Sequence, residues 1–274
     1  MWTAAAASVV ISACGSPGMA ATAAAVANSV SLSTLVWAPF GRVELGWSVY
    51  HPRIAAEIGT TCGATTTGFA AALATWQRRH GQSANGVFEP QTFAAMKTLW
   101  QAARPFTRIN GRTACPEPPP VARLEYARAT EGYGGKVVTL RIGALKAYRA
   151  MVADARKSPG VAADTRSLKL FSGYRDPTAD AERCARDGNC NGIVRATCSA
   201  HRTGLAIDLW VGQAPGFGPD SSADANRAAM VATPAYRWLI VHARRHGFVN
   251  YAFEPWHWEW IGEPVAVASA TPVK

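Results

Sequence analysis

The segment SAHRTGLAIDLW, residues 199–210, constrains the fold of this chain more than any other. Its apolar residues alternate as in a buried strand, where an aspartate needs an explanation. Two residues of one strand share a face only when an even number of positions separates them, and His201 and Asp208 are seven apart. Gly204 offers a break between them. We therefore expect His201 to approach from a turn, while residues 205–209 form a strand that directs Asp208 inward.

Two buried polar side chains that converge are unfavourable unless something compensates them, and a divalent metal ion does so. A zinc site needs a third protein ligand and keeps its fourth position for water. His242 and His246 lie four residues apart in a predicted helix, but the glutamate of the H-E-x-x-H pattern is missing between them. We expect that pair to be structural, and His80 to belong to a helical hairpin. The remaining candidates are His51 and His257.

His257 stands in the aromatic segment YAFEPWHWEWIG, residues 251–262, three residues after Glu254. The tryptophans of this segment lower the dielectric around it. A carboxylate in such surroundings has a raised pKa, which suits a general base beside a metal-bound water. The residues therefore predict a hydrolase site with His201, Asp208 and His257 as metal ligands and Glu254 as the base.

Apolar spacing outlines the elements around these motifs. Residues 140–158 and 228–248 have the period of helices, whereas residues 167–174 and 204–211 are typical of strands. The sequence therefore predicts a mixed domain in the second half of the chain.

Three segments of this domain resemble one enzyme family. SAHRTGLAID carries the whole S-x-H-x-x-G-x-A-x-D pattern, EPWHWEWIG resembles its partner E-x-W-H, and FSGYRD at 171–176 resembles an S-G-Y-R-S segment. Together they look like the zinc D-Ala-D-Ala peptidases of the VanY-like kind, over about residues 121–264. The resemblance implies an α+β fold, with a small antiparallel-sheet core shared with lysostaphin-type peptidases and the hedgehog signalling domain.

The same resemblance implies roles for individual residues. Zn²⁺ would be bound by His201, Asp208 and His257, and Glu254 would activate the water. Arg175 would hold the substrate carbonyl and stabilise the oxyanion. The further substrate contacts implied are Ser199, Ser172, Tyr174 and Trp256.

These roles predict a zinc-dependent D-alanyl-D-alanine carboxypeptidase acting on peptidoglycan stem peptides, in which a zinc-bound water attacks the peptide carbonyl. Family members usually carry Ser and Gln where this chain has Asp176 and Asp180, and many carry Arg in place of Glu259. Because added acids would hinder binding of a C-terminal carboxylate, a peptidoglycan endopeptidase that cuts cross-links or stem peptides stays open. A non-catalytic wall-binding protein is the alternative from a different class, although it would need neither the metal ligands nor Glu254.

A second resemblance concerns residues 41–104. Two amphipathic helices flank a turn at Asn85, and Pro90 suits the first turn of the second helix. The run WQRRHG…NGVFEPQTFAAM resembles the bacterial peptidoglycan-binding domain, with Asn85 where that pattern has Asp and Glu89 where it has Gly. The alternative is a generic helical hairpin packed on the peptidase domain.

The ends of the chain and the connection between the domains have distinct compositions. Residues 1–38 read as a signal or lipoprotein leader, because residues 2–38 carry no charge and ISAC resembles a lipobox ending at Cys14. Cleavage near residues 20–27 and an Ala-rich tail are the alternatives. Residues 105–120 read as a Pro-rich linker and 265–274 as a tail. We expect an exported protein of the periplasm or cell envelope, whose membrane contact is limited to a lipid on Cys14.

Lys and Arg outnumber Asp and Glu by 28 to 18, which favours anionic partners such as nucleic acid, acidic lipid or a polyanionic wall. The sequence has no Lys/Arg-rich run and no nucleic-acid-binding signature. We therefore expect peptidoglycan as the partner, no nucleic acid, and a monomer.

The cysteines suit an oxidising compartment. Cys62 and Cys115 bracket one segment that a disulfide between them would staple. Cys184, Cys190 and Cys198 share a polar loop in which one disulfide is expected. One thiol then stays free unless the cysteine at position 14 carries no lipid and pairs.

Overall fold

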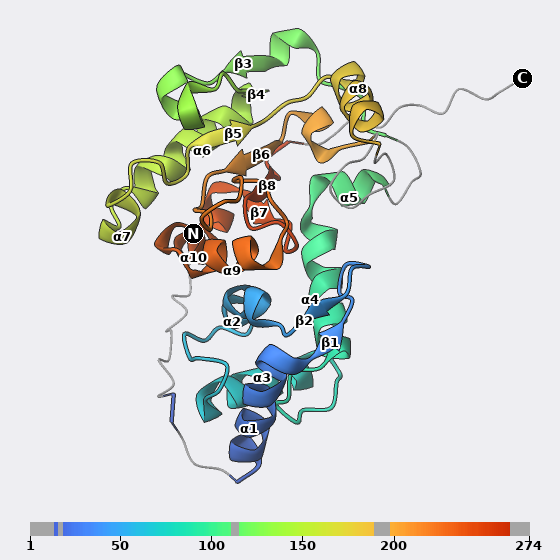
Figure 1. Ribbon diagram of the computed structural model, residues 1–274, viewed down its shortest axis with the longest axis vertical. Coiled ribbons are helices and arrows are strands. Elements are labelled where there is room, and N and C mark those ends of the chain that lie inside the picture. The colour runs from blue at the N-terminus through green and yellow to red at the C-terminus, as the bar shows by residue number, and fades with distance from the viewer. Residues whose placement is uncertain (1–13, 16–18, 111–114, 189–197, 264–274) are drawn as a thin grey trace, which may run out of the picture. The chain divides into compact units, whose positions relative to one another are not determined.

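The structure is a computed structural model, drawn in Figure 1. It describes residues 14–15, 19–110, 115–188 and 198–263. The chain divides into two compact units, residues 1–96 and 97–274. Helices and small antiparallel sheets make up both units, which confirms the predicted α+β class. In the part of the chain that is described, no helix combines the length and the apolar character needed to cross a membrane.

Unit 1 is helical and has an aromatic core. Trp47 stacks on Phe88 with 4.2 Å between ring centroids, and Phe69 packs against the same indole at 5.9 Å. The two predicted helices of the hairpin are confirmed, the second beginning at Pro90. The elements are α1 (Met19–Thr34), β1 (Val36–Trp37), β2 (Glu44–Leu45), η1 (Ser48–Tyr50), α2 (His51–Glu57), α3 (Thr67–Arg79) and α4 (Pro90–Ala103), the last of which continues past residue 96.

The turn between α3 and α4 is organised by one buried carboxamide. Gln77 donates from Nε2 to the backbone oxygen of Val87 at 3.0 Å and accepts from the backbone N–H of Gly86 at 2.8 Å. The same Nε2 lies 3.2 Å from Oδ1 of Asn85. These bonds explain why a polar residue is buried within an otherwise apolar helix face.

From Met19 onward, the residues of the predicted leader, 1–38, form helix α1 in the structure. The helix packs against α3, and the side chain of Asn28 is fully buried. Its Nδ2 donates to the backbone oxygen of Gly86 at 2.9 Å, and its Oδ1 accepts from the N–H of Phe88 at 2.7 Å. An uncharged, Ala-rich stretch is compatible with a leader and with a closely packed helix, and here the asparagine fixes it as part of unit 1.

The structure differs from the predicted lipid on Cys14, because in it Cys14 forms a disulfide with Cys62. A sulfur atom in a disulfide carries no thioether-linked lipid. The backbone oxygen of Cys14 accepts a hydrogen bond from the N–H of Gly68 at 3.1 Å, at the start of α3. This contact places the cysteine beside its partner.

The remaining cysteines also differ from the predicted pairing. Cys115 is joined to Cys198 and not to Cys62, because Cys62 is already engaged within unit 1. Cys184 is disulfide-bonded as well. Cys190 lies outside the described residues, as does the predicted tail at 265–274.

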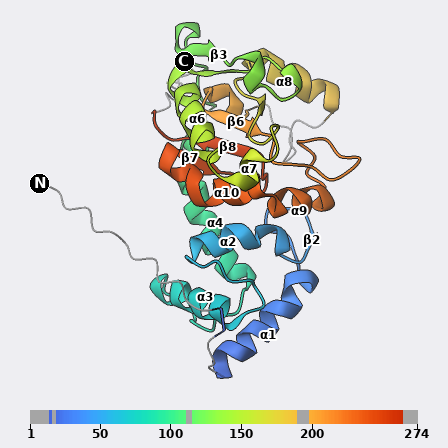
Figure 2. The same ribbon diagram turned by 90° about the vertical axis from the view of Figure 1, so that its left-hand side faces the viewer.

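Unit 2 contains the principal sheet, a four-stranded antiparallel sheet in the order β5–β6–β8–β7. A separate two-stranded sheet pairs β3 with β4. In Figures 1 and 2, α10 lies beside β7 and β8, with α9 and α7 next to it. The elements are α5 (Pro105–Asn110), η2 (Val121–Arg123), β3 (Leu124–Tyr126), η3 (Ala129–Glu131), η4 (Tyr133–Gly135), β4 (Thr139–Arg141), α6 (Ile142–Ala155), α7 (Pro159–Ala162), β5 (Leu170–Ser172), α8 (Pro177–Asp187), η5 (Ala200–Thr203), β6 (Ala206–Leu209), α9 (Asp224–Ala232), α10 (Pro234–His242), η6 (Ala243–His246), β7 (Phe248–Asn250) and β8 (His257–Trp260).

Strand β6 is buried along its whole length and positions the site. Gly204 has φ +68°, so it supplies the break that the sequence predicted between His201 in turn η5 and the strand. In the antiparallel register, Asp208 lies opposite His257 on one side and opposite Ser172 on the other. Three segments far apart in the sequence therefore meet at the end of β6.

The described residues of the predicted linker 105–120, namely 105–110 and 115–120, belong to unit 2. Helix α5 begins at Pro105, and the backbone N–H of Phe106 donates to Oε2 of Glu259 at 3.0 Å. Further on, Cys115 is tied to Cys198. The Pro-rich composition indicated a linker, but contacts at Phe106 and Cys115 tie this segment to the rest of unit 2.

We predict that Asn28→Ala destabilises unit 1. The substitution leaves two buried backbone groups without a partner, each of which costs about 1–3 kcal/mol. The free energy of unfolding should fall by roughly 2–4 kcal/mol. Urea titrations of the whole chain measure it, with hydrogen exchange at the amides of α3 reporting on unit 1. Ser29→Ala, at an exposed position of the same helix, is the matched control and should leave the value unchanged. Equal stabilities of the two variants would show that α1 is not part of the folded unit.

Candidate metal centre

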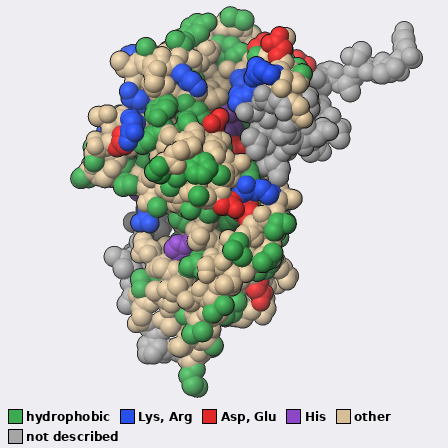
Figure 3. All heavy atoms as spheres, viewed as in Figure 1, with side chains coloured by type: hydrophobic (Ala, Val, Ile, Leu, Met, Phe, Trp, Pro, Cys, Tyr) green, Lys and Arg blue, Asp and Glu red, His purple; other side chains and the backbone are tan. Residues whose placement is uncertain are grey.

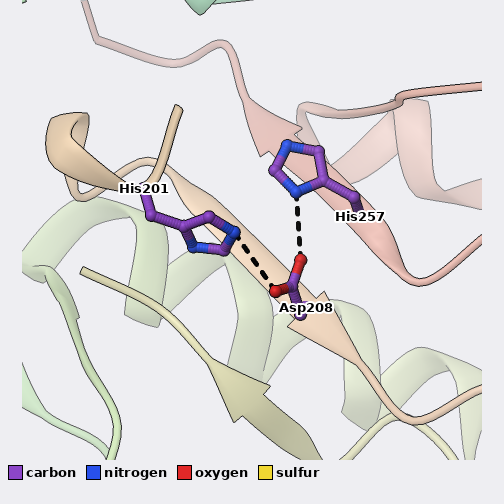
Figure 4. Close-up of side chains that lie close together, drawn as sticks. All are labelled: His201, Asp208 and His257. Carbon is purple, nitrogen blue, oxygen red and sulfur yellow. Dashed lines mark hydrogen bonds and ion pairs between the residues drawn. The ribbon is translucent and has the colours of Figure 1, made fainter. Parts of the chain in front are cut away.

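Two imidazoles and one carboxylate converge at the end of β6. Figure 4 shows both rings directed at Asp208, that of His201 from the turn before β6 and that of His257 from β8. Nε2 of His201 lies 3.2 Å from Oδ2 of Asp208, and Nδ1 of His257 lies 3.0 Å from Oδ1. All three side chains are buried, and one ligand atom from each falls within 4.8 Å of the others. The structure thus brings together the three predicted ligands.

The outer nitrogen of each ring is held by an acceptor. Nδ1 of His201 donates to the backbone oxygen of Gly173 at 2.7 Å, and Nε2 of His257 lies 3.4 Å from Oε1 of Glu259. A carbonyl or carboxylate oxygen can only accept, so these nitrogens carry the ring hydrogens. The inner nitrogens, Nε2 of His201 and Nδ1 of His257, are left facing Asp208.

This arrangement fits a cation between the three groups. With its hydrogen on Nδ1, neutral His201 turns a lone pair toward the Asp208 carboxylate, so two acceptors face each other at 3.2 Å. Such a contact is unfavourable unless a positive charge separates the acceptors. Two imidazole nitrogens and one carboxylate oxygen are also a common ligand set of catalytic zinc, with the hydrogen bonds of the outer nitrogens fixing ring orientation.

The charges of the three groups follow from their surroundings. Burial lowers the pKa of His201 to about 4 in spite of the Asp208 carboxylate. Burial alone would raise the pKa of Asp208, but the two histidines hold it well below its usual range. Burial opposes a charge on His257 too, yet hydrogen bonds to Asp208 and Glu259 raise its pKa to about 9. Without a metal ion, His257 therefore supplies the positive charge of the cluster.

Glu254 lies next to the three ligands without being one of them. Its Oε2 is 3.9 Å from Nδ1 of His257, beyond hydrogen-bonding distance. The turn that carries it is held by Asn250, whose Nδ2 donates to the backbone oxygens of Glu254 and His257 at 3.1 and 2.9 Å. Burial raises the pKa of Glu254 to about 7, the direction that the aromatic segment predicted. A carboxylate in this state can exchange a proton near neutral pH.

Arg175 is oriented by two partners at the edge of the cluster. Its guanidinium donates to Oγ of Ser199 at 2.9 Å and forms an ion pair with Asp180, also at 2.9 Å. Oγ of Ser199 in turn accepts from the backbone N–H of His201 at 3.1 Å. The predicted oxyanion residue is thus connected to the turn that carries the first ligand.

The two acids that replace Ser and Gln of the family pattern have structural partners. Asp176 caps helix α8, accepting from the N–H of Thr178 at 2.8 Å. Asp180 is buried against Arg175. Burial raises the pKa of Asp180, while Arg175, Arg202 and Arg183 oppose that rise. Both acids are therefore engaged within the protein, and Asp180 offsets the charge of Arg175.

The cluster opens into a pocket of about 400 Å³. Of the predicted substrate contacts, Ser172, Ser199 and Trp256 line it. Tyr174 was expected there too, but it is not among the described residues that line this pocket; its backbone N–H donates to the backbone oxygen of Thr139 at 2.7 Å. On the face drawn in Figure 3, Lys and Arg side chains lie in small groups with Asp and Glu side chains among them.

Several pocket residues were missed from the sequence. Lys136 follows the η4 turn, Arg183 lies on α8, and Arg104 lies just after α4. A buried charge in the Trp-rich segment, at Glu259, was a possible signal for Arg104, because a buried carboxylate needs a cation. For the other two, no signal in the sequence set them apart from surface residues.

The other histidine candidates lie elsewhere. His246 approaches Asp154 at 3.3 Å, and Trp238 packs against both His242 and His246, consistent with the predicted structural role of that pair. His80 stacks on Trp76 in unit 1, with 3.8 Å between ring centroids.

No protein-family model matches the sequence, and no curated protein matches it. Among solved structures, the chain is similar to LdcB LD-carboxypeptidase, whose structure revealed the molecular basis of peptidoglycan recognition. The two are 22% identical with a TM-score of 0.34, and the match covers 45% of this chain and 60% of that chain. The chain is also similar to a mutant of the vancomycin-resistance D,D-pentapeptidase VanY from a VanB-type cassette, in complex with Zn(II). Here the identity is 20% and the TM-score 0.29, and the match covers 53% of this chain and 83% of that one. The chain thus spans less than two thirds of the length of LdcB.

We predict that zinc binding releases a proton from His257. Its pKa of about 9 keeps the metal-free imidazole charged at about pH 8, and a metal ion at Nδ1 requires that nitrogen to be unprotonated. Calorimetric titrations in buffers of different ionisation enthalpy should give about one proton released per zinc, with affinity rising about tenfold per pH unit below the pKa. Binding without proton release at this pH would contradict the proposed role of Nδ1.

Proposed function

We propose that the chain is a zinc-dependent D-alanyl-D-alanine carboxypeptidase acting on peptidoglycan stem peptides. The observation that carries the proposal is the convergence of His201, Asp208 and His257, each ring with a fixed outer hydrogen bond, beside the buried carboxyl group of Glu254. Wall-binding alone requires neither the ligand geometry nor the raised pKa of that carboxyl group.

Nε2 of His201, a carboxylate oxygen of Asp208 and Nδ1 of His257 would hold the metal. A zinc ion at this place supplies Lewis acidity and lowers the pKa of water that it binds. The burial of the three side chains keeps bulk water away from the ligands, which strengthens electrostatic interactions in the site.

Glu254 performs the proton transfer. With a pKa of about 7, its carboxylate accepts a proton from the attacking water and later gives it to the leaving amine. Arg175, held by Ser199 and Asp180, presents its guanidinium toward the carbonyl oxygen on which negative charge develops. Trp256, buried in the pocket wall, excludes water from one side of the peptide.

The charged residues of the pocket support a substrate with a free carboxylate. A carboxypeptidase must neutralise the free carboxylate at the end of its substrate. Lys136 lines the pocket and supplies positive charge, Arg183 beside it is paired with Asp220 at 3.9 Å, and the acids at 176 and 180 are occupied by a helix cap and by Arg175. This arrangement supports cleavage of a C-terminal residue over cleavage within a chain.

Unit 1 would hold the enzyme on peptidoglycan, as its resemblance to wall-binding domains implies. Attachment raises the effective concentration of substrate without requiring tight binding at the active site. The disulfides Cys14–Cys62 and Cys115–Cys198 favour an oxidising compartment outside the cytoplasm, which is where this substrate lies.

Glu254→Gln should lower the rate of peptide cleavage by about 10²–10⁴-fold while zinc remains bound, because the amide cannot take up a proton. Mass spectrometry of purified muropeptides incubated with the zinc-loaded protein measures this. We expect the wild type to remove one D-alanine from pentapeptides. Glu117→Gln, at an exposed position of unit 2, is the matched control and should retain the activity.

Other products of the same experiment would replace the proposal. Cleaved dimers or shortened stems without free D-alanine would identify an endopeptidase. Absence of any product from a zinc-loaded wild type would leave a non-catalytic wall-binding protein.

A further inference from the structure

A buried ion pair lies behind the metal centre, on the far side of His257. Glu259, two residues further along β8, is 1% exposed and contacts Nε2 of His257 through Oε1 at 3.4 Å. Arg104 faces it with a guanidinium group that is itself mostly buried. Neither residue belongs to the ligand set, and both are charged where charge is costly.

The guanidinium group of Arg104 contacts Glu259, Gln101 and the ring of Tyr251. Its Nε donates to Oε1 of Glu259 at 2.7 Å, and its Nη1 donates to Oε1 of Gln101 at 2.7 Å. Its guanidinium carbon lies 4.1 Å from the centre of the Tyr251 ring. That ring packs edge-on to the imidazole of His257 at 6.1 Å between centroids. The arginine therefore supports the ligand through Glu259 and through an aromatic contact.

The second oxygen of Glu259 is also occupied, because it accepts from the backbone N–H of Phe106 at 3.0 Å. The carboxylate thus has three partners: the guanidinium of Arg104, a backbone amide and the ring of His257. The guanidinium and the backbone amide come from residues 104–106. These residues lie well before the motifs of the peptidase domain in the sequence. This short run, Arg104 to Phe106, is called the clamp segment below.

The hydrogen bond from Nε2 decides which nitrogen of His257 can bind a metal. An imidazole has one hydrogen when it acts as a ligand, and a carboxylate can only accept. Glu259 therefore holds that hydrogen on Nε2 and leaves the lone pair of Nδ1 directed at the centre of the cluster. Carboxylates in this outer position typically change metal affinity by 10–100-fold when they are removed.

We propose that Arg104 and Glu259 are positioning residues for the metal centre: Glu259 fixes the hydrogen on Nε2 of His257, and the clamp segment fixes Glu259. The inference rests on the proposed function, because it concerns the same metal ion. It adds that the centre is completed by a segment outside the peptidase motifs. A peptidase domain cut at residue 121 would lack this support.

The test compares the zinc affinity of two double variants. Arg104→Met with Glu259→Met removes both charges together while keeping side-chain volume, which is commonly tolerated at buried ion pairs. We expect its zinc dissociation constant, measured by competition with a chromophoric chelator, to rise 10–100-fold. The matched control is Arg149→Met with Glu131→Met, which removes an ion pair of 2.8 Å elsewhere in unit 2 and should leave zinc affinity unchanged.

Glu259→Gln provides a second, milder variant in case the double variant does not fold. Its amide oxygen can still accept from Nε2, so it should lose less affinity than the double variant. In the zinc-loaded wild type, nitrogen NMR of the imidazole rings should show the hydrogen of His257 on Nε2, and the double variant should exchange that hydrogen faster with water.

The outcomes separate this inference from the proposed function. A wild type that binds zinc, together with clamp variants that bind it equally well, would overturn the positioning role and leave the peptidase intact. A wild type without measurable zinc binding would overturn both. Weaker zinc binding in the clamp variants alone, with the control pair unaffected, is the result that supports the inference.

Discussion

The burial of one carboxylate, that of Asp208, is the constraint on which the rest of unit 2 depends. It lies on a strand that is buried along its whole length, with an imidazole directed at each of its oxygens. A charge in such a place is tolerated only if its neighbours are fixed to compensate it. The antiparallel register fixes His257 opposite it, and the left-handed Gly204 turns the chain so that His201 reaches it from outside the strand.

Each compensating group is itself supported by a partner further out. His201 is held by the backbone oxygen of Gly173, and His257 by Glu259, which Arg104 neutralises. Burial on its own would raise the pKa of Glu259, but Arg104 and His257 lower it to about 2, so this carboxylate stays charged at any ordinary pH. In the candidate metal centre, backbone groups and side chains of distant segments therefore decide the direction of two imidazole lone pairs.

The sequence predicted the inner part of this arrangement and little of the outer part. The convergence of His201, Asp208 and His257 beside Glu254 was predictable because a glycine break, strand periodicity and an aromatic segment each act locally along the chain. The Arg104–Glu259 pair joins residues 155 positions apart, and the Cys115–Cys198 disulfide spans 83, so spacing along the chain gives no indication of either. Small, uncharged residues suit a leader and a packed helix alike, so the composition of residues 19–34 gave no indication of the partners that Asn28 has in unit 1.

X-ray absorption at the zinc edge of the zinc-loaded protein is the most direct test of the central claim, that His201, Asp208 and His257 bind one metal ion. The spectrum should show two imidazole ligands and further nitrogen or oxygen neighbours at about 2.0–2.2 Å, and His201→Ala should remove one imidazole contribution. A shell of sulfur at about 2.3 Å, or a spectrum that the substitution leaves unchanged, would contradict the account.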